Sequence, residues 1–237
     1  MNELSLDVCA KNLGKHGFEI EIVSSLEEAG NRLREEIEKI HPQTVSYGDS
    51  ITVRKTGIVE ELRQRKDLMF HDGFNPDLSR EENMEERRKG LIADLFFTGI
   101  NAVSVTGSLH WLDMVGNRIA PLSFGPKRVV LLTGKNKLVS TPEDAVKRIK
   151  EIAAPQNVAR HPGFNTPCAK TGKCHDCNSP QRICNAWLTI ERCFPKGRIL
   201  VILIDEEWDF NYSTNSLNSL SKVASKFIEK PGCGRET

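Results

Sequence analysis

The residues with the clearest chemical potential in this sequence are cysteines. Four of the seven cysteines follow one another with the spacing C-x5-C-x2-C-x6-C, at Cys168, Cys174, Cys177 and Cys184. Thiolates are soft ligands that bind zinc or iron–sulfur clusters and do not suit magnesium or calcium. The central C-x2-C allows two thiolates to turn onto the same ion or cluster. We therefore expect a metal centre on these four residues.

The spacing favours an iron–sulfur cluster over zinc. A structural zinc ribbon pairs two C-x2-C knuckles, whereas this cysteine group contains one. Gly172 and Pro180 flank the knuckle and break regular structure, which frees the loop to wrap around a cofactor. We expect an iron–sulfur cluster of the [4Fe–4S] type. Zinc, and thiols that bind no metal, are the alternatives.

A second group of residues could bind a small anion. The segment Tyr47-Gly48-Asp49-Ser50-Ile51-Thr52 follows an expected strand and opens an expected helix, so its amides and hydroxyls would face a phosphate or carboxylate. Other loops at strand ends add donors and cations, in the place where α/β folds bind ligands. The expected ligand-binding residues are Gly48, Asp49, Ser50, Thr52, Thr106, Gly107, Asn117, Arg118 and Lys137. A plain helix cap at Ser50 and ordinary surface charge are the alternatives.

Catalytic groups are harder to assign. Asp49, Asp94, Asp113 and His110 could act as acids or bases, but no spacing ties them into a set. Neither G-x-G-x-x-G nor a Walker A sequence is present, so nucleotide binding has no motif support. The catalytic residues stay unassigned.

Composition excludes several classes of partner. Lys and Arg number 33 and Asp and Glu 32, for a net charge of +1, so no polycation is available to bind nucleic acid. No apolar run approaches the ~20 residues of a membrane span, and the start of the chain lacks the pattern of a signal peptide. We expect a cytoplasmic protein, where a reducing environment favours metal-binding thiols over disulfides.

Strands alternate with helices along the chain. A capping box at Ser25 and Glu28 opens a helix to about residue 40, and a second helix is expected over 51–64. Continuous apolar runs at 128–133 and 198–204 are typical of buried strands. Further expected elements are a hairpin of 101–105 with 109–112, a hairpin turn at 116–117 and a helix over 141–153.

This alternation predicts an α/β fold with a mainly parallel sheet flanked by helices. One domain is expected over residues 1–210, with a cysteine-rich, metal-binding loop at 155–190. The polar segment 211–237 is expected to be a weakly ordered tail.

Several blocks together resemble the LUD (lactate utilisation) domain family, over about residues 5–206. The blocks are Tyr47-Gly48-Asp49-Ser50, the run from Ala93 to Ala102, Gly116-Asn117-Arg118, Phe124-Gly125-Pro126-Lys127 and the run from Gly134 to Lys137. The resemblance implies a fold similar to the ribose-5-phosphate isomerase and CoA-transferase superfamily. It also implies a part in oxidising lactate to pyruvate within an iron–sulfur-dependent complex. The cysteine loop resembles an insertion found in a subset of the family.

These observations together predict an iron–sulfur-containing redox or regulatory component of lactate, or hydroxy-acid, utilisation. Its expected partners are other subunits of a lactate-oxidising complex or an electron carrier, together with a small anionic metabolite. Two alternatives stay open: a zinc-stapled module that binds a small anion, and an enzyme of the cyclo-ligase or isomerase kind that uses the glycine-loop pocket. The residues do not decide whether the chain is an enzyme.

Overall fold

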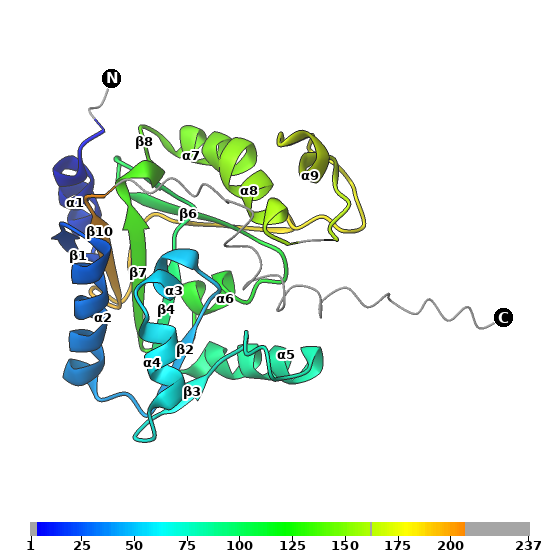
Figure 1. Ribbon diagram of the computed structural model, residues 1–237. Coiled ribbons are helices and arrows are strands. Elements are labelled where there is room, and N and C mark those ends of the chain that lie inside the picture. The colour runs from blue at the N-terminus through cyan, green and yellow to red at the C-terminus, as the bar shows by residue number, and fades with distance from the viewer. Residues whose placement is uncertain (1–3, 162, 207–237) are drawn as a thin grey trace.

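A six-stranded, all-parallel sheet forms the centre of the computed structural model, which describes residues 4–161 and 163–206 (Figure 1). Its order is β1-β10-β7-β4-β2-β3. The expected α/β fold with a mainly parallel sheet is confirmed. The strands are β1 (Glu19–Val23), β2 (Thr44–Tyr47), β3 (Met69–His71), β4 (Leu95–Gly99), β7 (Arg128–Gly134) and β10 (Ile199–Ile204).

Both faces of this sheet are covered, which explains the continuous apolar runs. Val130 and Leu132 of β7 point into one core, and the alternate residues Val129 and Leu131 point into the other. Helices α2 (Leu26–Ile40), α3 (Ile51–Lys55) and α4 (Ile58–Gln64) cover the first face. The other helices are α1 (Leu6–Lys15), α5 (Arg80–Lys89), α6 (Ile119–Ser123), α7 (Pro142–Arg148), α8 (Ala154–Ala159) and α9 (Pro167–Thr171).

A second, four-stranded sheet packs on the other face, together with α1 and α6. The predicted hairpin is confirmed as β5 and β6, which pair antiparallel. Trp111 of β6 is fully buried and donates its indole N–H to the carbonyl oxygen of Gly99, 2.8 Å away, so it ties the two sheets together. The strands of this sheet are β8 (Leu138–Val139), β5 (Ala102–Ser104), β6 (Ser108–Asp113) and β9 (Ala186–Ile190).

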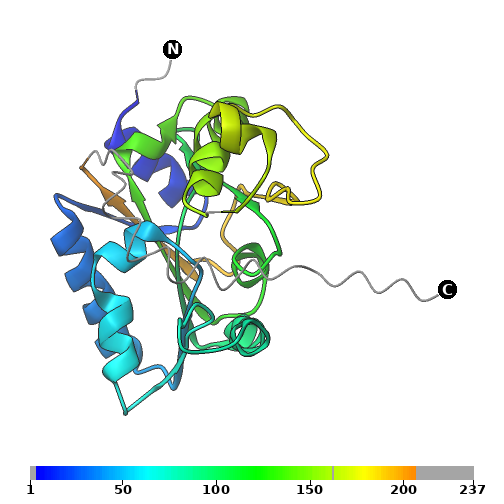
Figure 2. The same cartoon turned by 45° about the vertical axis from the view of Figure 1, so that its right-hand side comes forward.

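The cysteine-rich segment lies beside a composite helix. The predicted helix at 141–153 begins as expected, with the Thr141 side chain as its cap, and continues through a π-helical turn, Ile149–Ala153, into α8. Both views of the chain place α9 and the loop after it beside α8 (Figures 1 and 2). The segment 155–190 is therefore not one long loop, because it contains most of α8 and all of α9 and β9.

Two local predictions are wrong. Gly116 and Asn117 form no hairpin turn, since the chain after β6 enters α6 instead of a second strand. The helix predicted over 51–64 is split at Gly57, whose φ of +79° is left-handed and interrupts the helical backbone. The predicted tail, 211–237, lies outside the described residues.

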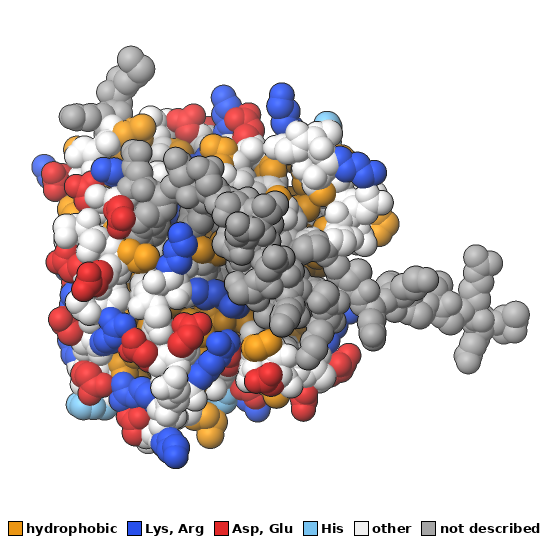
Figure 3. Space-filling view, viewed as in Figure 1, with side chains coloured by type: hydrophobic (Ala, Val, Ile, Leu, Met, Phe, Trp, Pro, Cys, Tyr) orange, Lys and Arg blue, Asp and Glu red, His pale blue; other side chains and the backbone are white. Residues whose placement is uncertain are grey.

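On the face shown in Figure 3, acidic and basic side chains of the described residues are interspersed, in keeping with the near-zero net charge. Within the described ranges, no helix has the length and apolar character to cross a membrane.

Candidate functional site

The carboxyl ends of β2, β4 and β7 lie side by side in the sheet, and most of the predicted ligand-binding residues lie there. Gly48, Asp49, Ser50 and Thr52 follow β2 directly. The Ser50 side chain accepts a hydrogen bond from the backbone N–H of Val53, so the helix cap, which was the alternative interpretation of Ser50, is present. Ser50 is thus engaged by its own helix, and Asp49 and Thr52 are the members of this segment whose side chains bond to other elements.

Asp49 holds two arginines. Its carboxylate lies 3.1 Å from Nε of Arg54 and 2.5 Å from Nη2 of Arg160, which comes from the end of α8. Burial alone would raise the pKa of Asp49, but the charges of Arg160 and Arg54 outweigh it and hold that pKa far below its usual range. Asp49 is therefore a fixed anion that positions guanidinium groups, and it is not a proton donor at neutral pH.

His161 lies within the same charged group. Burial, together with the charge of Arg160, lowers the pKa of His161 to about 4, although the carboxylate of Asp49 acts in the opposite direction. The imidazole is consequently neutral at pH 7. It stands 5.9 Å from the ring of Phe164, measured between ring centroids.

A second group of cations surrounds Lys137, which ends a short 3-10 turn after β7. Its amine nitrogen lies 3.4 Å from the hydroxyl oxygen of Thr52. Burial lowers the pKa of Lys137 to about 7, and the charges of Arg148 and Arg118 act in the same direction. Arg148 is itself fixed, because its guanidinium donates to the carbonyl oxygens of Asn101 and Asn136.

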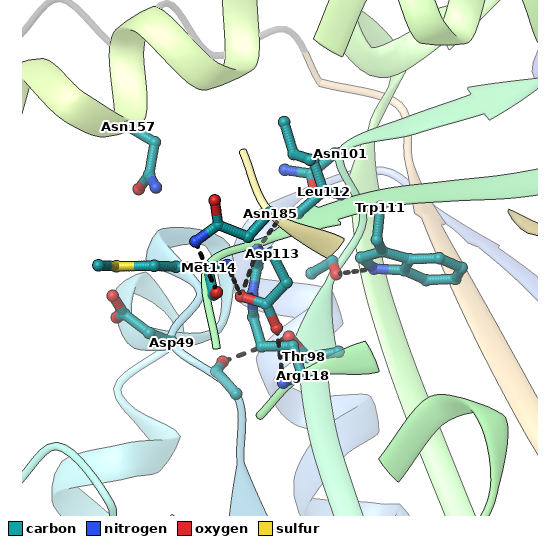
Figure 4. A network of polar contacts seen from close by, with 12 residues as sticks. Asp49, Thr98, Asn101, Trp111, Leu112, Asp113, Met114, Arg118, Asn157 and Asn185 are labelled. Carbon is teal, nitrogen blue, oxygen red and sulfur yellow. Dashed lines mark hydrogen bonds and ion pairs between the residues drawn. The ribbon is translucent and has the colours of Figure 1, made fainter. Parts of the chain in front are cut away.

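Arg118 approaches the backbone of Gly48 closely. A Cβ at position 48 would lie 2.6 Å from Cγ of Arg118 and 2.8 Å from the hydroxyl oxygen of Thr98, so only glycine fits there. The guanidinium of Arg118 donates to the carbonyl oxygen of Leu112 at 2.6 Å and pairs with the buried carboxylate of Asp113 at 3.4 Å (Figure 4).

Tyr47 carries a buried hydroxyl at this edge of the sheet. Tyr47 is 2% exposed, and its hydroxyl oxygen has no hydrogen-bond partner among the described residues. Its ring packs against Phe70 and Phe74, and the guanidinium of Arg54 lies 5.6 Å from the ring centre. A buried polar group without a partner costs free energy, and such groups are rare outside functional positions.

Other predicted residues lie elsewhere. Thr106 and Gly107 form the turn between β5 and β6 and lie against α1, where His16 Nδ1 is 2.8 Å from the Gly107 carbonyl oxygen. The structure does not bring these two residues to the Asp49 group. Asn117 lies in the turn before α6, next to Arg118 in the chain.

Two acid–base candidates have structural partners instead. Asp94 lies at the amino edge of the sheet, where it accepts bonds from Thr44 and Lys127 and lines a hollow of about 560 Å³. His110 is 2% exposed and bridges the hydroxyls of Ser108 and Thr189. Burial lowers the pKa of His110, which keeps the ring neutral.

Sequence reasoning missed Tyr47, Arg54, Arg148, Arg160 and His161 as members of the site. The position of Arg54, five residues after Asp49 in the predicted helix, was the one available signal. Arg160 and His161 fall in a segment without periodicity, so nothing in the sequence relates them to Asp49.

The four loop cysteines are free thiols and are partly buried. Burial raises the pKa of Cys184 to about 11; the nearby charge of Arg182 lowers it, and the other three cysteines raise it further. The backbone N–H of Asp176 donates to Sγ of Cys174 at 3.4 Å, and Asp176 has a left-handed φ of +47°.

Arg182 fixes the backbone of this loop. Its guanidinium donates to the carbonyl oxygens of Cys177 at 2.7 Å and Cys184 at 2.8 Å. Cys184 packs against a small core formed by the second sheet and the composite helix. In the described part of the chain, no three His, Cys, Asp or Glu side chains are arranged to hold a single metal ion.

The loop and the cationic group meet at the end of β6. Asn185 follows Cys184, and its side-chain amide donates to the carbonyl oxygen of Met114 at 3.1 Å. The neighbouring Asp113 is the residue that pairs with Arg118 (Figure 4). The cysteine loop and the cationic site are therefore both held by the end of β6.

Fold and site define an α/β protein with a cationic cluster at the carboxyl edge of a parallel sheet and a cysteine loop beside it. The LUD domain model matches residues 6–204, and the chain belongs to the LUD domain family. It is also similar to the crystal structure, at 1.70 Å resolution, of a DUF162 family protein from Deinococcus radiodurans. That likeness has a TM-score of 0.48 and 14% sequence identity, and covers 85% of this chain and 96% of the other. Comparison with curated proteins finds no match.

Proposed function

We propose that this chain is an iron–sulfur component of lactate, or hydroxy-acid, utilisation. In this proposal Cys168, Cys174, Cys177 and Cys184 hold a [4Fe–4S] cluster, and the cationic group around Asp49 binds the carboxylate of a small acid. The observation that carries the proposal is the position of the four-cysteine loop, which is joined through Asn185 to the strand that supports Arg118.

The chemistry of the loop supports a cluster. Four thiolates are the usual ligands of iron–sulfur clusters, and hydrogen bonds to sulfur, such as the one from Asp176 to Cys174, tune their potentials. Zinc needs all its ligands at one point, with each sulfur about 2.3 Å from the ion. In a cluster the thiolates bind different irons and need not converge on one point. When bound, the cluster would supply one-electron transfer or redox sensing.

Charge balance supports a carboxylate ligand. Asp49 is a single anion between Arg54 and Arg160, while Lys137 and Arg148 lie nearby without a carboxylate in any ion pair of the described residues. The excess of positive charge is suited to a carboxylate or phosphate. In the proposed role the partner is another subunit of a lactate-oxidising complex, or an electron carrier in the cytoplasm.

Metal and sulfide analysis of anaerobically purified protein tests the cluster. We expect brown protein with iron and acid-labile sulfide in equal amounts, and a paramagnetic resonance signal after reduction. Cys177→Ser should lose both elements. Cys193→Ser is the matched control, because Cys193 lies outside the loop and a serine hydroxyl can keep its bond to the carbonyl oxygen of Pro195. Colourless protein with stoichiometric zinc would overturn the iron–sulfur assignment.

A small-anion binding module is the second candidate, because no loop cysteine contributes to the group of Asp49, Thr52 and Lys137. Titration calorimetry with lactate, pyruvate and phosphate separates the two. Zinc in the wild-type protein, together with anion binding that survives the loss of all four cysteines, supports the zinc-stapled module. Turnover that survives the same change supports an enzyme of the cyclo-ligase or isomerase kind.

A further inference from the structure

Lys137 differs from other lysines of the described residues, such as Lys127 and Lys135, because it forms no ion pair with a carboxylate there. Lys135, in the same turn, pairs with Asp205 at 3.0 Å, and Lys127 pairs with Asp94 at 2.8 Å. The amine of Lys137 has the hydroxyl of Thr52 as its hydrogen-bond partner and two guanidinium groups as its charged neighbours. An ammonium group has three donors, and one of them is used within the part of the chain that the structure describes.

We propose that Lys137 is a nucleophile that captures the carbonyl group of a small 2-oxo acid as an imine. This inference rests on the proposed function, because the 2-oxo acid is the oxidised form of the hydroxy acid assigned to the site. It adds a covalent step and a reacting atom, Nζ of Lys137, to what is otherwise a binding site for anions.

The surroundings of Lys137 favour the neutral amine, which is the nucleophilic form. Burial and the charges of Arg148 and Arg118 lower the pKa of Lys137 to about 7. Both guanidinium groups stay charged at neutral pH, so their repulsion of a charged Lys137 persists. Arg148 is also held in place, because it is hydrogen-bonded to two backbone carbonyl oxygens. Lysines desolvated in this way, next to another cation, are the ones that form Schiff bases in proteins.

The same surroundings suit the acid half of the ligand. A 2-oxo acid carries a carboxylate next to its carbonyl carbon, and Arg118 and Arg148 provide positive charge close to Nζ of Lys137. Once the amine is neutral, these guanidinium groups are the cations left to attract the carboxylate. Binding of the carboxylate in this way places the carbonyl carbon next to the amine.

The step balances without an oxidant or a further reactant. The nitrogen lone pair attacks the carbonyl carbon and forms the C–N bond, and the carbonyl oxygen takes up a proton. The nitrogen loses its protons, the oxygen leaves as water, and the C=N bond remains. The Thr52 hydroxyl lies 3.4 Å from Nζ, within hydrogen-bonding distance, and can pass a proton between nitrogen and oxygen.

Reductive trapping with pyruvate tests the proposal. The full-length protein is incubated anaerobically with pyruvate and cyanoborohydride, which reduces an imine to a stable amine, and is then analysed by intact mass and peptide mapping. We expect one N-carboxyethyl group per chain, on Lys137. At pH 7 an amine with a pKa near 7 exceeds an ordinary lysine in its neutral fraction on the order of a thousandfold. The trapping rate should accordingly level off just above pH 7.

Two variants and a binding measurement complete the test. Lys137→Gln should abolish the adduct, and Lys135→Gln, in the same turn, should leave it unchanged. Adducts spread evenly over many lysines, or a rate that keeps rising towards pH 10, would overturn the imine. Pyruvate that binds by calorimetry but is never trapped would also overturn it, while leaving the proposed carboxylate site intact. If neither lactate nor pyruvate binds, both the imine and the proposed carboxylate site would be overturned.

Discussion

The backbone N–H of Asn185 donates a hydrogen bond to the carbonyl oxygen of Asp113 at 3.1 Å. Asn185 directly follows the last cysteine of the loop, and the Asp113 carboxylate pairs with Arg118 at the cationic site. The end of β6 therefore connects the loop of the proposed cluster to the site of the proposed ligand.

The first prediction concerns this support. Asp113→Asn leaves the Arg118 guanidinium, 15% exposed, without its carboxylate, and breaking a buried pair in this way costs about 3 kcal/mol of unfolding free energy. Urea unfolding measures the loss. The matched control is Asp67→Asn, which removes an exposed partner of Arg65 and should cost at most ~1 kcal/mol. Equal effects in the two variants would contradict the structural role of Asp113.

The second prediction concerns Gly48. Gly48→Ala forces a methyl group against Arg118 and Thr98, so we expect a loss of about 1–3 kcal/mol in stability and weaker pyruvate binding. Gly14→Ala is the control, because Gly14 lies in α1 with no atom within 4 Å of the added Cβ. That variant should gain up to ~1 kcal/mol from helix propensity. Thermal unfolding and calorimetry measure both; unchanged affinity in Gly48→Ala would contradict the placement of Arg118.

The third prediction concerns the Tyr47 hydroxyl. Tyr47→Phe removes a buried polar group that has no partner among the described residues, so the free protein should be stabilised by about 1 kcal/mol. If the hydroxyl serves the ligand, pyruvate affinity should fall about fivefold in the same variant. Denaturant unfolding and calorimetry provide the two values. A destabilised variant would show that the hydroxyl already has a partner.

The fourth prediction concerns pH. The pKa of His161 is about 4 in the folded chain, against about 6.5 for a free histidine. Between these values the unfolded chain binds a proton that the native chain does not, so stability falls as pH falls from 6.5 to 4, by about 3 kcal/mol in all. His161→Gln should flatten this part of the stability profile, measured by urea unfolding at a series of pH values. An unchanged slope would assign the acid sensitivity to other groups.

Buried strands and helix caps could be predicted from the sequence. Parallel strands buried on both faces are apolar at nearly every position, so the runs at 128–133 and 198–204 predicted β7 and β10. Caps act over three residues, so Ser25, Ser50 and Thr141 marked helix starts correctly. The turn at Gly116 was misread, because its residues permit a hairpin but do not determine which element follows.

The sequence by itself determined the α/β class, the helix caps and the identity of the four clustered thiols, because these depend on residue type and short spacing. Tertiary structure alone decided which residues meet. Asp49 and Arg160 are 111 positions apart, and Thr52 and Lys137 are 85 apart. They meet because the strand order brings β2, β4 and β7 together, and because α8 returns its last turn to the same edge. The pattern of one strand does not encode its neighbours, so Thr106 and Gly107 could be grouped with Gly48 in sequence while packing against α1 in space.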